Sequence, residues 1–205
     1  MRRKFGCLAA TGALVASVAY GIPQLLQVAG VLVDPWDRIL IFAPSLALAP
    51  AFVLTMVAVH ATASRAKQIW SLAALALAIM YGVLVSIVYV TQLGVVIPHE
   101  LRGDSDHYKL LACCGAGQFM TGIDLLGYTL MSLSTLFAAP VFDGAGLRRV
   151  VSTWLFANGL LAPFLIMQLA YPKLIFVGAL WLVTFPLAML FLALLFRQAE
   201  SEEQQ

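Results

Sequence analysis

Six apolar stretches, each long enough to cross a lipid bilayer as a helix, constrain this chain more than any other feature. A spanning α-helix needs about 20 mostly apolar residues, because the hydrocarbon core of a bilayer is about 30 Å thick. Short polar breaks separate the stretches, which together occupy most of the 205 residues. They run approximately over residues 6–30, 39–62, 69–97, 116–141, 149–170 and 173–196. We therefore predict one all-α membrane domain over residues 1–205, a bundle of about six transmembrane helices.

The composition supports this interpretation and excludes other classes. Hydrophobic residues make up 62% of the chain and charged residues only 11%. A soluble domain carries about 25% charged residues, which it needs to cover a surface that faces water. The excess of apolar residues must therefore face membrane lipids. A net charge of +2 without a basic stripe gives no reason to expect a nucleic-acid partner.

The amino-terminal segment resembles a signal peptide, because three basic residues precede an apolar run. Residues 17–19, Ser-Val-Ala, resemble a cleavage site. The apolar character nevertheless continues to Val33, well beyond the short apolar core of a signal peptide. We predict that this segment is an uncleaved first helix.

The positions of Lys and Arg predict how the chain is oriented, because positively charged loops are retained in the cytoplasm. With a cytoplasmic amino terminus, eight of the twelve basic residues lie inside and four outside. The inside set is Arg2, Arg3, Lys4, Arg65, Lys67, Arg148, Arg149 and Arg197, and the outside set is Arg38, Arg102, Lys109 and Lys173. We expect both termini in the cytoplasm of a cell whose inner (plasma) membrane holds this multi-pass protein.

Small side chains recur every four residues in the first three stretches. Helices pack closely in lipid where small residues face each other. We therefore expect the first three helices to pack tightly together. The repeats are Ala9, Ala13, Ser17 and Gly21; Ala43, Ala47, Ala51 and Thr55; and Ala74, Ala78, Gly82 and Ser86.

Asp124 is the most informative single residue, because it lies inside the fourth apolar stretch. A charged side chain at the centre of a bilayer costs about 2.5–3.5 kcal/mol on insertion scales, so an acid there is a functional hypothesis by default. Polar residues at spacings of three and four place a continuous stripe on the same face of this helix. The stripe comprises Gln118, Thr121, Asp124, Tyr128, Ser132 and Thr135.

Other stretches add polar side chains that the predicted orientation brings into the same extracytoplasmic half of the bundle. We expect a polar pocket there, in which Gln24, Gln27, Gln92, Gln118, Thr121 and Gln168 contact a ligand. Asp124, Tyr89 and Tyr128 are the candidate catalytic residues, since a buried carboxyl and two phenols can hold and transfer protons. The alternative for each Gln and Tyr is that it only holds the helices together by hydrogen bonds.

The remaining polar and aromatic residues support no further site. We interpret Cys7, Cys113 and Cys114 as buried, unreactive thiols, because adjacent cysteines bridge poorly. The loop from His99 to His107 holds metal-ligand residue types in a spacing that matches no known motif. We predict no metal or cofactor, and whether this loop binds metal is left open. The aromatic residues Trp36, Trp70, Trp154, Tyr171 and Trp181 are interpreted as anchors at the lipid headgroup level.

Three functions from different classes are compatible with these residues. The first is a carrier or receptor-like protein that binds a small or amphiphilic ligand, with Asp124 as its anchor or proton carrier. The second is a membrane-embedded enzyme that acts on a lipid or isoprenoid-like substrate, with Asp124 as general acid. The third is a non-catalytic subunit or assembly factor, whose polar stripe contacts another membrane protein.

Overall fold

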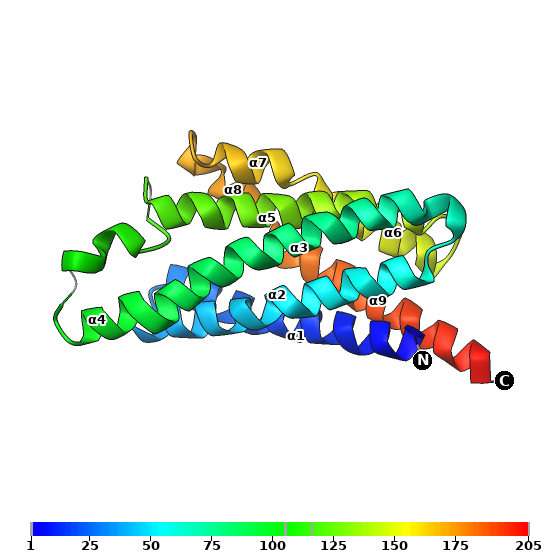
Figure 1. Cartoon of the computed structure of the whole chain (residues 1–205), viewed down its shortest axis with the longest axis horizontal. Coiled ribbons are helices and arrows are strands. Elements are labelled where there is room, and N and C mark those ends of the chain that lie inside the picture. The colour runs from blue at the N-terminus through cyan, green and yellow to red at the C-terminus, as the bar shows by residue number, and fades with distance from the viewer. Residues whose placement is uncertain (1, 105, 116, 205) are drawn as a thin grey trace.

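The computed structural model describes residues 2–104, 106–115 and 117–204 and is built from helices (Figure 1). Six of its helical segments are long and apolar enough to cross a membrane, which confirms the predicted number. The segments are Arg2–Val28, Trp36–Thr62, Arg65–Leu101, Phe119–Val141, Leu147–Met167 and Pro172–Ala199. Each overlaps the stretch predicted from the sequence, and the ends differ by up to four residues.

Some of these segments combine several helical elements. The first two are single helices, α1 (Arg2–Val28) and α2 (Trp36–Thr62). The third comprises η1 (Arg65–Lys67), α3 (Gln68–Thr91), the π-helical turn η2 (Gln92–Val96) and α4 (Ile97–Leu101). After the short helix η3 (Asp106–Leu111), the fourth comprises α5 (Phe119–Ala138) and η4 (Ala139–Val141). The fifth and sixth comprise α6 (Leu147–Gly159), α7 (Ala162–Met167), η5 (Pro172–Leu174), α8 (Ile175–Gly178) and α9 (Trp181–Gln204).

The long helices form a closed ring that follows chain order. Helix α1 packs against α2, α2 against α3, α3 against α5, α5 against α6, α6 against α9, and α9 back against α1. Both termini lie at the same end of the bundle (Figure 1), as an even number of crossings requires. The predicted close packing of the first three helices holds for the two neighbouring pairs, while α2 lies between α1 and α3.

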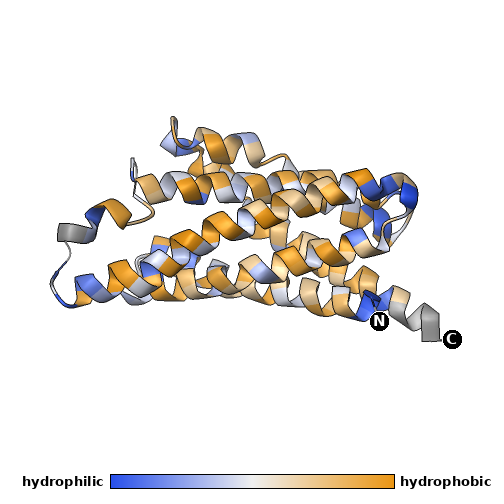
Figure 2. Cartoon of the chain, in the orientation of Figure 1, coloured by the Kyte–Doolittle hydropathy of each residue, from blue (hydrophilic) through white to orange (hydrophobic). Residues whose placement is uncertain are grey.

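The surface of the ring is apolar along its length and polar at its two ends (Figure 2). Large apolar side chains are exposed on the outer faces of the helices, among them Leu8, Ile22, Ile69 and Phe176. In water such a surface would cost free energy in proportion to its apolar area. In lipid it costs nothing, so the distribution agrees with a multi-pass membrane protein.

The small-residue repeats on α1 and α2 differ in how deeply they are buried. On α1, Ala9, Ala13, Ser17 and Gly21 are all buried, as predicted. On α2, Ala43 and Ala47 are exposed, so that prediction was wrong. The buried face of α2 carries larger side chains instead, including Leu48, Phe52 and Met56. These fill the centre of the ring, where a small side chain would leave a void.

Helices α5 and α6 approach each other closely at Gly159. A Cβ added to Gly159 would lie 2.5 Å from Leu136 Cβ and 2.7 Å from Leu136 Cα. These distances are far below van der Waals contact, and backbone atoms cannot move aside as a flexible side chain would. Gly159 therefore allows α6 to pack directly on α5.

We predict that Gly159→Ala destabilises the protein by about 1–3 kcal/mol, the usual range for overpacking a well-filled core. The measurement is thermal unfolding of the purified protein in detergent micelles. Gly94→Ala is the matched control, because a Cβ at Gly94 meets no atom within 4 Å. Equal melting temperatures for the two variants would contradict the close approach of α5 and α6.

Candidate functional site

Asp124 lies on α5 and turns its carboxyl group toward the interior of the bundle. The residue is half-buried, and its Oδ1 atom is buried without a hydrogen-bond partner. Further along the same face, Ser132 and Thr135 are fully buried. The polar stripe predicted on this helix therefore faces the protein, because lipid offers a polar group no hydrogen-bond partner.

The two candidate catalytic tyrosines lie beside Asp124. The hydroxyl group of Tyr89, on α3, donates a hydrogen bond of 2.9 Å to the hydroxyl of Tyr128, one turn after Asp124 on α5. Asp124 lies one turn before Tyr128 on the same face of α5. The structure thus brings all three residues together. A hydroxyl both donates and accepts, so the two phenols can pass a proton between them.

Aromatic rings from four helices surround this group. Trp181, at the start of α9, makes edge-to-face contacts with Tyr20 (5.7 Å between ring centres) and with Tyr128 (5.2 Å). Tyr81 lies edge-on to Tyr128 at 5.9 Å. We call the five rings of Tyr20, Tyr81, Tyr89, Tyr128 and Trp181 the aromatic box.

Two members of the aromatic box share the unusual state of Asp124. The Tyr81 hydroxyl and the Trp181 indole nitrogen are buried without a hydrogen-bond partner. A buried polar group that lacks a partner costs about 1–3 kcal/mol, so native proteins tolerate few of them. The Asp124 carboxyl and two members of the aromatic box therefore each keep a polar atom that could bond to a further group.

A short loop precedes α5 and lies beside Asp124. Three side chains that were predicted to bind a ligand hold this loop in place. Gln92, in the π-helical turn, donates to the Leu111 carbonyl at 2.7 Å and accepts from the Cys113 backbone N–H at 3.0 Å. Thr121 accepts from the Cys114 backbone N–H at 3.0 Å. Gln118 accepts from the next backbone N–H, that of Gly115, at 2.8 Å. These three side chains therefore hold protein backbone in this structure.

The interpretation of Cys113 and Cys114 as separate, unreactive thiols was wrong. The two residues are joined by a disulfide, and Cys114 is exposed. The loop fixes both backbones by hydrogen bonds, which brings the sulfurs together. The potential ligand atoms of Cys113, Cys114 and Asp124 all lie within 4.8 Å of one another. Cys7 is a free thiol on α1.

The two predicted glutamines of α1 form a chain of hydrogen bonds that leads away from the aromatic box. Tyr20 donates to Gln24 at 3.4 Å, Gln24 to Gln27 at 2.9 Å, and Gln27 to Asp37 at 2.8 Å. Asp37 lies in the first turn of α2. The chain connects the ring of Tyr20 with the polar end of the bundle.

Gln168 takes a different position from the other predicted site residues. It follows α7, and its Nε2 would lie 2.5 Å from a Cβ added to Gly178. Its side chain therefore packs on the backbone of α8 in the hairpin between the fifth and sixth spans. The described contacts give Gln168 a structural role.

Sequence analysis missed three components of the site. Trp181 was interpreted as a headgroup anchor, but it is only 4% exposed and stacks on Phe185 at 4.8 Å between ring centres. Tyr20 could have been found, because it lies one turn before Gln24 on the same helix face. The cysteine pair offered no pattern in the sequence that ties it to Asp124.

The loop that starts at His99 was left open as a metal site. In the described residues, His99 stacks on Tyr108 at 3.8 Å between ring centres and lies 3.4 Å from an Asp104 carboxylate oxygen. Ser105 and the side chain of His107 lie outside the described part of the chain. The described residues of this loop form no metal-ligand group.

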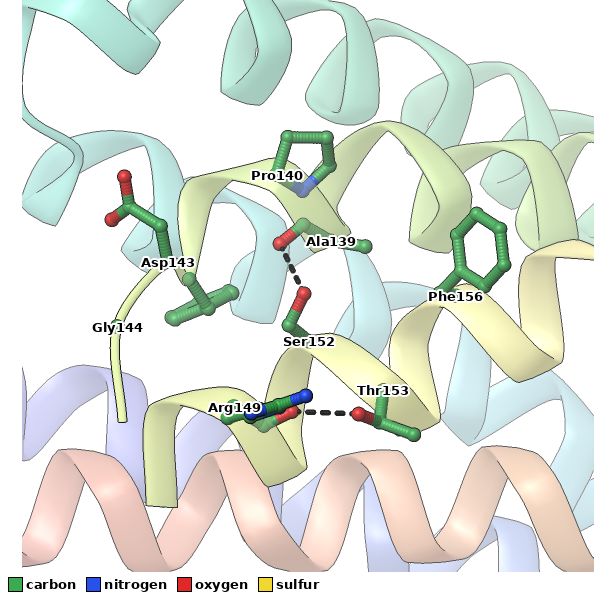
Figure 3. A pocket seen from close by; sticks show the side chains of 9 residues that line it. Ala139, Pro140, Asp143, Gly144, Arg149, Ser152, Thr153 and Phe156 are labelled. Atoms are coloured by element: carbon green, nitrogen blue, oxygen red, sulfur yellow. Dashed lines mark hydrogen bonds between the residues drawn. The ribbon is translucent and has the colours of Figure 1, made fainter. Parts of the chain in front are cut away.

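An open groove of about 450 Å³ lies at the opposite end of the bundle, between η4 and α6 (Figure 3). Its lining includes Pro140, Asp143, Arg149 and Phe156. The hydroxyl of Ser152 donates to the Ala139 carbonyl at 2.9 Å and thereby joins its two walls. The groove holds none of the residues around Asp124 and is separate from the candidate site.

The comparisons with known proteins contribute no identification. No protein-family model, no curated protein and no solved structure matches this chain. The functional argument therefore depends on the site itself.

We predict that Gln92→Leu lowers the free energy of unfolding by about 1–3 kcal/mol, because it leaves two buried backbone groups without a partner. Thermal unfolding in detergent measures this loss. The Cys113–Cys114 disulfide should also be reduced faster, since the loop that presents it loses its tether to α3. Gln68→Leu, at an exposed position at the other end of α3, is the control. Unchanged stability and reduction rate would contradict the role of Gln92.

Proposed function

We propose that this protein lies in the plasma membrane with both termini in the cytoplasm and binds a small or amphiphilic ligand at Asp124. The ligand carries a positive charge, and the protein acts as a carrier or receptor-like protein. The observation that carries the proposal is the buried, unpartnered Oδ1 atom of Asp124 inside the aromatic box.

The proposed orientation has support from two kinds of residue. Eight of twelve basic residues then lie in the cytoplasm. The Cys113–Cys114 disulfide then lies at the extracytoplasmic end, where the environment is oxidising enough for disulfides to persist. Both arguments point the same way and are independent of each other.

The proposed charge of the ligand follows from what surrounds Asp124. The middle of each span lacks Lys and Arg, so the protein supplies no cation deep in the membrane. An isolated carboxylate in an apolar environment is costly unless it takes up a proton or pairs with a cation. Aromatic rings favour the second partner, because the faces of Tyr and Trp attract cations by about 0.5–2 kcal/mol each.

A membrane-embedded enzyme is the second candidate function, and a different observation favours it. Tyr89 and Tyr128 are hydrogen-bonded to each other, and Asp124 lies one turn before Tyr128 on α5. General acid catalysis needs a proton donor placed beside a second group that stabilises the developing charge. A lipid or isoprenoid-like substrate would reach this group from the membrane.

We predict that the purified, untreated protein binds tetraphenylphosphonium, a lipophilic cation, and that Asp124→Asn weakens this binding about 10- to 100-fold. That range corresponds to the roughly 1.5–3 kcal/mol that a charged partner contributes to a buried interaction. Quenching of tryptophan fluorescence reports binding, because Trp181 belongs to the aromatic box. Tetraphenylborate, an anion of the same shape, should bind more weakly than the cation.

Asp143→Asn is the matched control, since Asp143 is exposed and lies at the other end of the bundle. Equal affinities of wild type and Asp124→Asn for the cation would contradict the proposal. An enzyme would instead keep substrate binding in Asp124→Asn and lose turnover by about 10²–10⁴-fold. Loss of a membrane-protein partner or of stability alone would assign the polar stripe to assembly.

We predict that Leu110→Cys reacts with a membrane-impermeant maleimide on intact cells, because Leu110 is 84% exposed at the proposed extracytoplasmic end. The substitution is made in a chain with Cys7, Cys113 and Cys114 replaced by serine. Ala66→Cys, in the turn between α2 and α3, is the control and should react only after permeabilisation. The reverse pattern would invert the orientation.

A further inference from the structure

One wall of the candidate site contains a second potential binding group, which combines Asp124 with two cysteines that the proposed function does not use. Cys113, Cys114 and Asp124 place two sulfurs and a carboxylate oxygen within 4.8 Å of one another. Two sulfur ligands of one tetrahedral zinc ion are about 3.8 Å apart, since each bond is about 2.3 Å long. The three potential ligand atoms are already this close while the two sulfurs are bonded, and reduction of the disulfide frees the sulfurs to move apart toward the spacing that a metal ion requires.

The surrounding structure fixes these three groups independently of any metal. Gln92 and Thr121 bind the backbone N–H groups of Cys113 and Cys114, respectively, so the sulfurs are presented by a tethered loop. Asp124 projects from the rigid helix α5, and its Oδ1 atom has no partner in the protein. A site whose ligands are held by neighbouring hydrogen bonds loses little conformational entropy on binding.

The types of ligand atom select the metal. Thiolates are soft ligands that favour zinc, cadmium and copper(I), whereas magnesium and calcium require several oxygens. Two thiolates and one carboxylate give three negative charges, of which a divalent cation neutralises two. Three protein ligands also leave a fourth position of a tetrahedral ion open for water or another ligand.

We propose that Cys113, Cys114 and Asp124 bind a soft divalent cation when the Cys113–Cys114 disulfide is reduced. Reduction by a phosphine breaks the S–S bond and yields two thiols, while water supplies their two protons and the oxygen of the phosphine oxide. The cation then forms two metal–sulfur bonds and releases the two thiol protons to solvent. The exposed position of Cys114 gives both the reductant and the metal access to the site.

This inference goes beyond the proposed function and can fail separately from it. The organic cation is expected in the disulfide form, and the metal ion only in the dithiol form. A bound metal ion uses the carboxyl group of Asp124, so the two ligands exclude each other. The redox state of one pair of cysteines therefore decides which class of cation the site accepts.

We expect one Cd²⁺ ion to bind per chain in the full-length protein after reduction with a phosphine and removal of the reagent without oxygen. The measurement is a titration with cadmium chloride in detergent, followed by the ultraviolet absorption of the cadmium–thiolate bond. The untreated disulfide form should give no such absorption, which is a comparison that needs no substitution. Magnesium chloride should not compete.

Matched variants identify the ligands. Cys113→Ser and Cys114→Ser should each reduce the absorption and the affinity, whereas Cys7→Ser should bind as wild type does. Asp124→Asn should raise the dissociation constant about 10- to 100-fold, which is the loss seen even for groups that only support a metal ligand. Asp37→Asn, at the same end of the bundle, should leave it unchanged.

Two results would overturn the metal site. One is equal cadmium absorption in the disulfide and dithiol forms, and the other is an unchanged dissociation constant in Asp124→Asn. Cadmium binding without phosphonium binding would support the metal site and reject the proposed organic cation. Phosphonium binding in the disulfide form without cadmium binding in the dithiol form would do the opposite.

Discussion

The hydrocarbon core of a bilayer offers no hydrogen bonds, and this constraint governs the arrangement of the whole molecule. A polar side chain on a spanning helix must find its partner inside the protein, or it pays several kcal/mol. Helix α5 carries the longest row of such side chains and turns it inward, so Ser132 and Thr135 are fully buried. The ring of helices closes around this row. Asp124 lies in the half of the row that begins α5.

Neighbouring helices satisfy Thr135, which lies in the part of the row nearer the two termini. Asn158 of α6 donates to Thr135 at 3.0 Å and accepts from Thr184 of α9 at 2.9 Å, which joins three helices. Nearer the other end, Asp124, Tyr81 and Trp181 each keep a buried polar atom without a partner, as Ser132 does within the row. The group at Asp124 differs because it contains a carboxyl, and this is the physical basis of the binding proposed there.

The glutamines show why residue type and position along a helix do not determine a role. Gln92 and Gln118 lie on the predicted side of the bundle, but they bind the backbone of the loop that carries the cysteines. A glutamine has both a donor and an acceptor, so it pairs equally well with a ligand or with a peptide group. Only the fold brings the loop of residues 111–115 next to these side chains, and no sequence pattern indicates that neighbour.

The sequence by itself determined the number and approximate limits of the spans, and the inward face of α5 with Asp124 on it. These features follow from local properties, namely the apolar length that a bilayer requires and the periodicity of a helix. The tertiary structure decided what lies around Asp124. The aromatic box, the burial of Trp181 and the bonded pair Cys113–Cys114 join residues from four helices and a loop. Such contacts depend on how helices far apart in the chain pack, which no local pattern encodes.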